Sequence, residues 1–192
     1  MNDEEIKLFA MSHQMLESEL DKVEDQFKLD LCRGNEQETT KDEQYYPQFG
    51  EAIRAEAASM AKHYEIFYCL EKSIRDLIRG KLSAEKGTDW WNQGVPVTVK
   101  NNVEGNIKRE LDSGVTQRST EKIDYTTFGE LGEIVRSNWQ IFSDTFNSQK
   151  AFDKIMTSLN ILRGPIAHCC PLAEDEVARL RLTLKDWFRL ME

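Results

Sequence analysis

The chain has 192 residues, of which 40% are hydrophobic and 31% are charged, and its formal net charge at pH 7 is -9. This length and apolar content suffice for one domain with a hydrophobic core and an extension. No apolar run approaches the roughly 18 residues of a membrane span, and the N-terminal MNDEEIKLFA is acidic where a signal peptide is basic. The four cysteines lack the spacing of a disulfide framework or a CxxC pair. We therefore expect a soluble, cytoplasmic protein with no membrane partner.

The negative charge is unevenly distributed along the chain. Residues 1–44 hold 13 acidic and 5 basic side chains, a balance of -8, whereas residues 150–192 hold 6 acidic and 7 basic ones, a balance of +1. Nucleic-acid binding depends on excess Lys and Arg, so a net charge of -9 would ordinarily count against it. Because the acidity belongs to the N-terminal region, a nucleic-acid partner for the rest of the chain is not excluded.

The first predicted element is an amphipathic helix over residues 6–27. Its apolar positions recur at alternating steps of three and four, as in a heptad seam: Ile6, Phe9, His13, Leu16, Leu20, Val23 and Phe27. Either it packs on its own domain or it associates with itself or a partner. The polar stretch 32–50 lacks periodicity and contains Pro47, so it reads as a linker. We divide the chain into an acidic helical arm with linker, residues 1–44, and a helical domain, residues 45–192.

The domain begins with a helix predicted over residues 51–82, loosened near its end by Gly80. One face carries the apolar residues Met60, Tyr64, Phe67, Ile74 and Ile78, widened by Leu70 and Leu77. Residues 83–98 are expected to form a loop in which Trp90 and Trp91 cap the core, although tryptophans can also stack on bases. A short helix over residues 99–111, ended by Ser113-Gly114, follows.

Three further helices complete the domain. Thr126 and Thr127 can cap a helix from Phe128 to about residue 142. A second helix covers residues 151–162, and a third, over about residues 173–191, has acidic residues first and basic residues last, as the helix dipole favours. No stretch has the pattern of a strand. The fold class is therefore all-α, a bundle of four to five helices with an additional N-terminal amphipathic helix.

The stretch SLNILRGPIAHCC places Arg163 and His168 five residues apart at the edge of an apolar helix. On one straight helix this spacing separates two side chains by about 140° around the axis. A residue before proline is disfavoured in the helical conformation, and proline suits a first helical turn. Gly164 and Pro165 therefore predict that one helix ends near Arg163 and another begins at Pro165, with His168 in its first turn.

This arrangement predicts an anion site. A helix start offers unpaired N–H groups and a partial positive charge. Arg163 adds a bidentate phosphate donor, and His168 adds a group that gives or takes a proton near neutral pH. These groups suffice to cleave RNA without metal or cofactor, since histidine moves protons and arginine stabilises the charge that grows at phosphorus. The spacing alone is a weak signal, because a single His beside an apolar helix is more often structural.

Helices with the motif Arg-x-x-x-x-His resemble the signature of the HEPN superfamily of α-helical ribonucleases and nucleotide-binding domains. Here LNILRGPIAH carries it. The chain is also similar to the Swt-type branch through YEIFYCLEKSIRDLIRGKL, DWWNQGVPV and YTTFGELGEIVRSNWQIFSDTF, which precede the motif helix in that order. The resemblance covers about Tyr64 to Arg189, and four segments in order are far more specific than the motif alone.

The resemblance implies an antiparallel HEPN-like bundle and a metal-independent endoribonuclease. Its active site would form where two protomers meet, each contributing Arg163 and His168. A second superfamily feature, Glu followed four residues later by a basic residue, is matched by Glu71 and Arg75. Glu71 is either buried and paired with a cation such as Arg163, or partly exposed and paired with Arg75 within its helix.

Two positions depart from the family pattern. The residue after the Arg is most often Asn, whereas this chain has Gly164, which can cap a helix but has no side chain to touch substrate. Members that pair with a nucleotidyltransferase antitoxin have Tyr two places after the His, where this chain has Cys170, so that modification is not expected here. Cys169 and Cys170 are adjacent and lack the usual spacing of zinc ligands, so no metal is expected.

Two functional hypotheses follow. The first is a homodimeric endoribonuclease of toxin–antitoxin, phage-defence or RNA-processing type, with RNA as substrate and an antitoxin or another partner protein as candidate regulator. The alternative is a catalytically inactive HEPN module that binds a nucleotide, RNA or a partner protein, with Gly164 as a mark of lost activity.

Overall fold

A computed structural model of the chain describes residues 16, 19–20, 22–23, 26–27 and 48–192. The chain divides into two compact units, residues 1–50 and 51–192. Within the predicted first helix, each described residue is helical. The remainder of that helix, and the predicted linker up to residue 47, lie outside the described residues.

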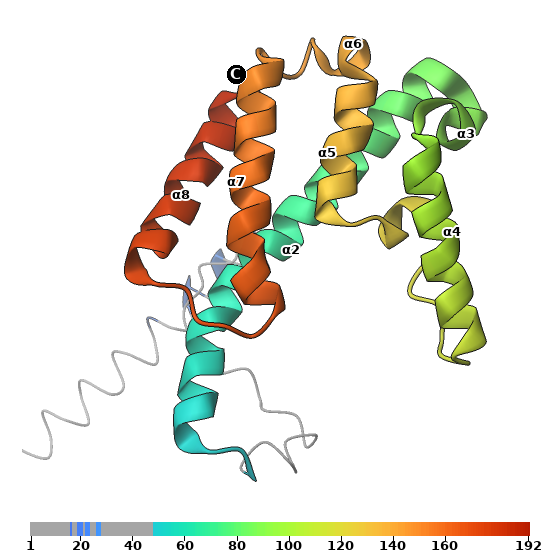
Figure 1. Cartoon of the computed structure of the whole chain (residues 1–192). Coiled ribbons are helices and arrows are strands. Elements are labelled where there is room, and N and C mark those ends of the chain that lie inside the picture. Colours follow the sequence, from blue (N-terminus) through green and yellow to red (C-terminus); the bar gives the residue numbers. More distant parts are fainter. Residues whose placement is uncertain (1–15, 17–18, 21, 24–25, 28–47) are drawn as a thin grey trace, which may run out of the picture. The chain divides into compact units, whose positions relative to one another are not determined.

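The second unit contains helices joined by turns and one longer polar loop. In chain order they are α2 (Glu51–Lys86), η2 (Gly87–Asp89), α3 (Trp90–Gly94), α4 (Val97–Asp112), η3 (Lys122–Tyr125), α5 (Phe128–Ser137), α6 (Trp139–Phe142), α7 (Gln149–Ala167) and α8 (Glu174–Arg189). Helices α5, α7 and α8 alternate in direction, and the long α2 packs against α3, α5 and α7 (Figure 1). No strand occurs in residues 48–192, which confirms the all-α, antiparallel bundle predicted from the sequence.

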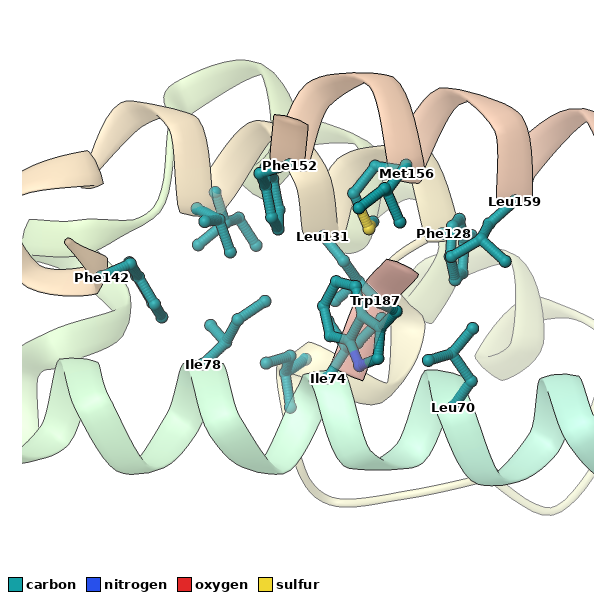
Figure 2. Packing of buried hydrophobic residues seen from close by; sticks show 14 of the residues in the cluster. Leu70, Ile74, Ile78, Phe128, Leu131, Phe142, Phe152, Met156, Leu159 and Trp187 are labelled. Atoms are coloured by element: carbon teal, nitrogen blue, oxygen red, sulfur yellow. The ribbon is translucent and has the colours of Figure 1, made fainter. Parts of the chain in front are cut away.

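The core lies where α2, α5, α7 and α8 meet. Figure 2 shows large apolar side chains from all four helices turned toward one another, among them Ile74 and Ile78 of α2, Leu131 of α5, Phe152 of α7 and Trp187 of α8. Each of these side chains is at most 3% exposed. Burial of one such side chain is worth about 1.5–3 kcal/mol, so these contacts hold the helices together and fix the positions of the polar residues beside them.

Helix α2 is long because its apolar positions keep helical spacing to the end. Leu82 is fully buried, and its packing outweighs the cost of about 1 kcal/mol for glycine in a helix, so α2 continues past Gly80 to Lys86. The prediction that Tyr64 belongs to the buried face is wrong, because its side chain is 62% exposed. Tyr64 lies about 60° around the axis from Phe67, where α2 faces a pocket instead of the core.

The paired tryptophans cap the core, as predicted. Trp91 is buried, Trp90 packs against the core, and their rings meet edge to face with centroids 5.6 Å apart. The segment around them is more helical than expected, since it contains the end of α2, η2 and α3. Helix α4 ends at Asp112, before Gly114, which adopts a φ of 68° that glycine accommodates without strain.

The start of α5 is fixed by a capping box. The Thr127 hydroxyl accepts the Glu130 N–H at 3.4 Å, and Oε2 of Glu130 accepts the Thr127 N–H at 2.7 Å. The predicted helix of residues 128–142 is interrupted at Asn138, which separates α5 from α6. Nδ2 of Asn138 donates to the carbonyl of Gly94 at 2.6 Å and so ties this break to the end of α3. Among the described residues, no helix is long and apolar enough to cross a bilayer.

Candidate active site

Helix α7 runs without interruption through Gly164 and Pro165 and ends at Ala167. The predicted helix break at this pair is therefore wrong. The side chain before a proline is disfavoured in a helix partly because its Cβ meets the proline ring, and Gly164 has no Cβ. Because Gly164 can stay helical in front of Pro165, α7 continues past Arg163 to Ala167.

His168 caps the C-terminal end of α7 and does not lie in a first helical turn. Its N–H donates to the carbonyl of Gly164 at 3.1 Å, and the N–H of Cys170 donates to that of Pro165 at 2.8 Å. Cys169 has a φ of 55°, the left-handed conformation of a Schellman turn, where glycine is usual. The free N–H groups expected to bind an anion at this point are absent, because this end of the helix presents carbonyls.

Arg163 and His168 point in different directions from the one continuous helix, about 140° apart around its axis. Arg163 lines a pocket between α2 and α7, and the side chain of His168 is exposed outside it. Within the residues that the structure describes, one protomer therefore does not bring the two predicted catalytic side chains together.

Glu71 holds Arg163 in place. Oε2 of Glu71 accepts a hydrogen bond from Nε of Arg163 at 3.1 Å, and Oε1 accepts one from Nη2 of Arg75 at 2.5 Å. The Glu71 side chain is only 13% exposed. The structure combines parts of the two interpretations left open by the sequence: the carboxylate is largely buried, as in the first, and it pairs both with Arg163 of α7 and with Arg75 of its own helix.

Arg75 is fixed more firmly than an ordinary surface arginine. In addition to Glu71, it donates from Nε to the carbonyl of Ile123 at 3.2 Å and from Nη2 to the carbonyl of Thr126 at 3.0 Å. These bonds attach α2 to the turn before α5. Arg163 is therefore held by a network of Glu71, Arg75 and the two backbone carbonyls. The terminal nitrogens of Arg163 make no hydrogen bond to residues 48–192.

The pocket around this network has a volume of about 270 Å³ and is rich in cations and tyrosines. Its walls are Tyr64, Phe67, Tyr68, Glu71, Lys72 and Arg75 of α2, Arg118 and Asp124 of the loop before α5, and Arg163, Ile166 and Ala167 of α7. Four cationic side chains face two carboxylates there. An excess of positive charge suits a phosphate.

Arg118 reaches the pocket from the polar loop between α4 and η3. It forms an ion pair with Glu110 of α4, and its guanidinium lies 5.0 Å from the centre of the Tyr125 ring. The hydrogen bond from Arg118 lowers the pKa of Glu110 below its ordinary value. These contacts secure the loop, so that Arg118 is held at the rim.

His168 shares a separate stripe of α7 with the exposed residues Thr157 and Ile161 and the half-buried Gly164, all within about 40° of it around the axis. Ile161 is 68% exposed, although it is a large aliphatic residue. A Cβ added to Gly164 would meet no atom within 4 Å other than its chain neighbours and the backbone of its own helix. The predicted supporting residue Gly164 therefore belongs to the His168 stripe and not to the Arg163 pocket.

Sequence reasoning missed the pocket residues Tyr68, Lys72 and Arg118. A signal for two of them exists, since Tyr64, Tyr68 and Lys72 follow at steps of four along α2 beside Glu71. Arg118 carries no such signal, because it lies in an aperiodic loop whose position depends on tertiary contacts. Among the described residues, no group of three or more His, Cys, Asp or Glu side chains could hold a metal ion.

The family model described as Swt1-like HEPN matches residues 65–192. The chain belongs to the Swt1-like HEPN family. This match contains α2 from Glu65 onward together with every later helix, including the His168 stripe and every residue of the Arg163 pocket except Tyr64. Membership of the HEPN family indicates a ribonuclease-type or RNA-binding module. No curated protein matches the chain, and no solved structure matches it.

Proposed function

We propose that this HEPN protein is a metal-independent endoribonuclease whose active site is completed when two copies associate. The observation that carries the proposal is the placement of Arg163 and His168 on different faces of the one continuous helix α7. A single copy cannot direct both side chains at one phosphate, whereas a second copy related by a two-fold axis can supply the missing group.

The exposed stripe of α7 is the surface we assign to this association. It combines the aliphatic side chain of Ile161 with the short residues Thr157 and Gly164, so a second helix can approach closely. Two-fold symmetry would bring the two copies of His168 together at one shared site, to which the long side chain of each Arg163 must extend from the pocket on the other side of its own α7. Two histidines and two arginines would then face the substrate.

The proposed chemistry is transfer within the RNA strand. One His168 takes the proton from the 2′-hydroxyl, whose oxygen forms a bond to phosphorus while the bond to the 5′-oxygen breaks. The other His168 gives its proton to that departing oxygen. Arg163 stabilises the charge that grows on the phosphoryl oxygens. The products are a 2′,3′-cyclic phosphate and a 5′-hydroxyl end.

The decisive experiment compares RNA cleavage by the wild-type chain with that by His168→Ala and Arg163→Ala. General acid–base help is worth about 10²–10⁴ in rate and a lost oxyanion donor about 10²–10³, so both variants should lose detectable cleavage while their helical circular dichroism is unchanged. Wild-type activity should persist in EDTA. Cleavage that survives in both variants, or stops with the chelator, would remove Arg163 and His168 from the mechanism. The alternative of a binding module, in which Gly164 marks lost activity, would then be favoured for this site.

A mixing experiment tests whether the site is shared. A dimer of one Arg163→Ala chain and one His168→Ala chain retains one arginine and one histidine at the common site, whereas each pure variant lacks one group entirely. Co-purified mixed dimers should therefore regain part of the cleavage that neither variant shows. No recovery in verified mixed dimers would mean that one arginine and one histidine do not suffice, as expected if the site needs both histidines.

The toxin, phage-defence and RNA-processing roles can be distinguished by the effect of the expressed protein on the growth of a host cell. A toxin or defence nuclease should arrest growth when expressed, and His168→Ala should relieve that arrest. Rescue by a co-expressed neighbouring gene product would identify an antitoxin or other regulator. Growth unaffected by an enzyme that cleaves RNA in solution would favour the processing role.

A further inference from the structure

Two exposed tyrosines stand beside the Arg163 pocket without a structural role in the core. Tyr64 and Tyr68 are 62% and 56% exposed, and their ring centroids are 6.2 Å apart. Both rings line the pocket that contains Glu71 and Arg163. We infer that this pair forms a stacking surface for unpaired bases of single-stranded RNA next to the phosphate at Arg163. The inference rests on the proposed function and specifies its substrate class.

The two tyrosines lie on the same face of α2 as Glu71, the residue that holds Arg163. Tyr64, Tyr68 and Glu71 lie within about 60° of one another around the helix axis. Along that axis, Tyr68 lies about 4.5 Å before Glu71, and Tyr64 lies about 10 Å before Glu71. A strand whose phosphate contacts Arg163 can therefore run along α2 over both rings.

The charges of the pocket suit the backbone of such a strand. Lys72 follows Tyr68 by one turn of α2, and its ammonium group is 3.9 Å from a carboxylate oxygen of Asp124, with a side chain that is 48% exposed. Arg118 at the rim has a side chain that is 56% exposed. The pocket thus combines two exposed cations with two aromatic rings, and proteins hold single strands with this combination: cations track the phosphates and rings accept the bases.

The size of the pocket limits what enters it. Its volume of about 270 Å³ lies near the lower end of small-ligand pockets, which begin at about 300 Å³. One nucleotide fits this space better than a longer segment. Bases in a duplex are stacked and paired, so they cannot turn their faces to Tyr64 and Tyr68. The expected ligand is unpaired RNA.

The test measures binding of a fluorescein-labelled RNA of about 12 nucleotides by fluorescence anisotropy, with the full chain carrying His168→Ala to prevent cleavage. Tyr64→Ala combined with Tyr68→Ala should weaken binding at least about tenfold, because stacking contributes substantially for each base. The matched control, Tyr64→Phe with Tyr68→Phe, keeps both rings and should bind within about twofold of the parent. The same RNA annealed to its complement should bind weakly and show no dependence on the tyrosines.

Binding measured at several salt concentrations distinguishes the contribution of base stacking from that of phosphate contacts. Loss of binding in Lys72→Ala should diminish as salt rises, because phosphate contacts release counterions, whereas loss in the tyrosine variant should persist. Equal binding by the alanine and parent proteins would overturn the inference. A parent that binds no single-stranded RNA would overturn it as well.

The outcomes also distinguish this inference from the proposed function. Tyrosine-dependent binding in a wild-type chain that never cleaves RNA supports the stacking surface and refutes the nuclease. Normal cleavage and normal RNA binding with both tyrosines replaced by alanine support the nuclease and refute the stacking surface. A change of molecular mass from dimer to monomer in the alanine variant would instead assign the rings to a protein contact.

Discussion

Nε of Arg163 donates to Oε2 of Glu71 over 3.1 Å, which links two residues that lie 92 positions apart in the chain. The same carboxylate accepts from Arg75 through its other oxygen. One largely buried acid thus fixes the position of the candidate catalytic arginine and joins α7 to α2. The network is both a structural contact and the support of the proposed site.

Replacement of Glu71 should therefore affect stability and cleavage together. Glu71→Gln leaves two partly buried guanidinium groups without their anion, and we expect a loss of about 1–3 kcal/mol in the free energy of unfolding. Cleavage should fall as well, because Arg163 is no longer held. Asp76→Asn is the matched control on the same helix, since the Asp76–Arg79 pair is largely exposed and should cost at most about 1 kcal/mol. Equal losses in urea unfolding would contradict the assigned role.

Ile161 should determine the association of two copies. Ile161→Asp places a carboxylate in the proposed helix contact, so the dimer should dissociate at least tenfold more readily and RNA cleavage should fall with it. Because Ile161 is 68% exposed, the folded monomer should be unaffected. Leu182→Asp on α8, at a side chain that is 61% exposed, supplies the control. A dimer that survives Ile161→Asp in light scattering would place the interface elsewhere.

Gly164 should be required for α7 to pass Pro165. An exposed glycine inside a helix is normally improved by alanine, and Gly105→Ala in α4 should raise the free energy of unfolding by about 0.5–1 kcal/mol. Gly164→Ala should give no such gain, because its new Cβ meets the proline ring. In a Pro165→Ala background, Gly164→Ala should become stabilising. The same gain with and without Pro165 would refute this explanation for the continuous helix.

His63 should make stability depend on pH. It is only 4% exposed, and its Nδ1 has no hydrogen-bond partner among the described residues. Burial, with contributions from Lys62 and Arg181, lowers the pKa of His63. The unfolded chain then binds more protons than the folded one, so stability should be full above the unfolded pKa of about 6.5 and decrease as pH falls below it.

The control for this effect is His63→Gln, which removes the titrating group. Urea unfolding between about pH 5.5 and 7.5 should show a shallower pH dependence for the variant than for the wild-type chain. Identical slopes would mean that other groups account for the loss of stability in acid.

Much of the architecture can be predicted because helices are specified locally. The spacing of apolar residues along α2 and α7 predicts which faces are buried. Thr126 and Thr127 predict the start of α5, where the structure shows a capping box of Thr127 with Glu130. The motif residues Arg163 and His168 and the family resemblance follow from the same local patterns. Glu71 and Arg75 could be named as a pair for this reason.

Predictions from local sequence rules were wrong where a rule has an exception or where burial depends on packing between helices. The rule against a helical residue before proline applies to side chains with a Cβ, and Gly164 escapes it, so α7 continued where a break was predicted. Tyr64 follows the apolar periodicity of α2, yet no other helix of residues 51–192 covers it, and its side chain is exposed there.

By itself, the sequence determined an all-α domain with a candidate Arg–His pair, since helix periodicity and caps depend on residues within a few turns. Only the tertiary structure decided that Glu71 bridges Arg75 and Arg163, that Arg118 reaches the same pocket, and that His168 faces away from it. The physical reason is that ion pairs and pockets arise from residues far apart in the chain, and their positions depend on how the helices pack.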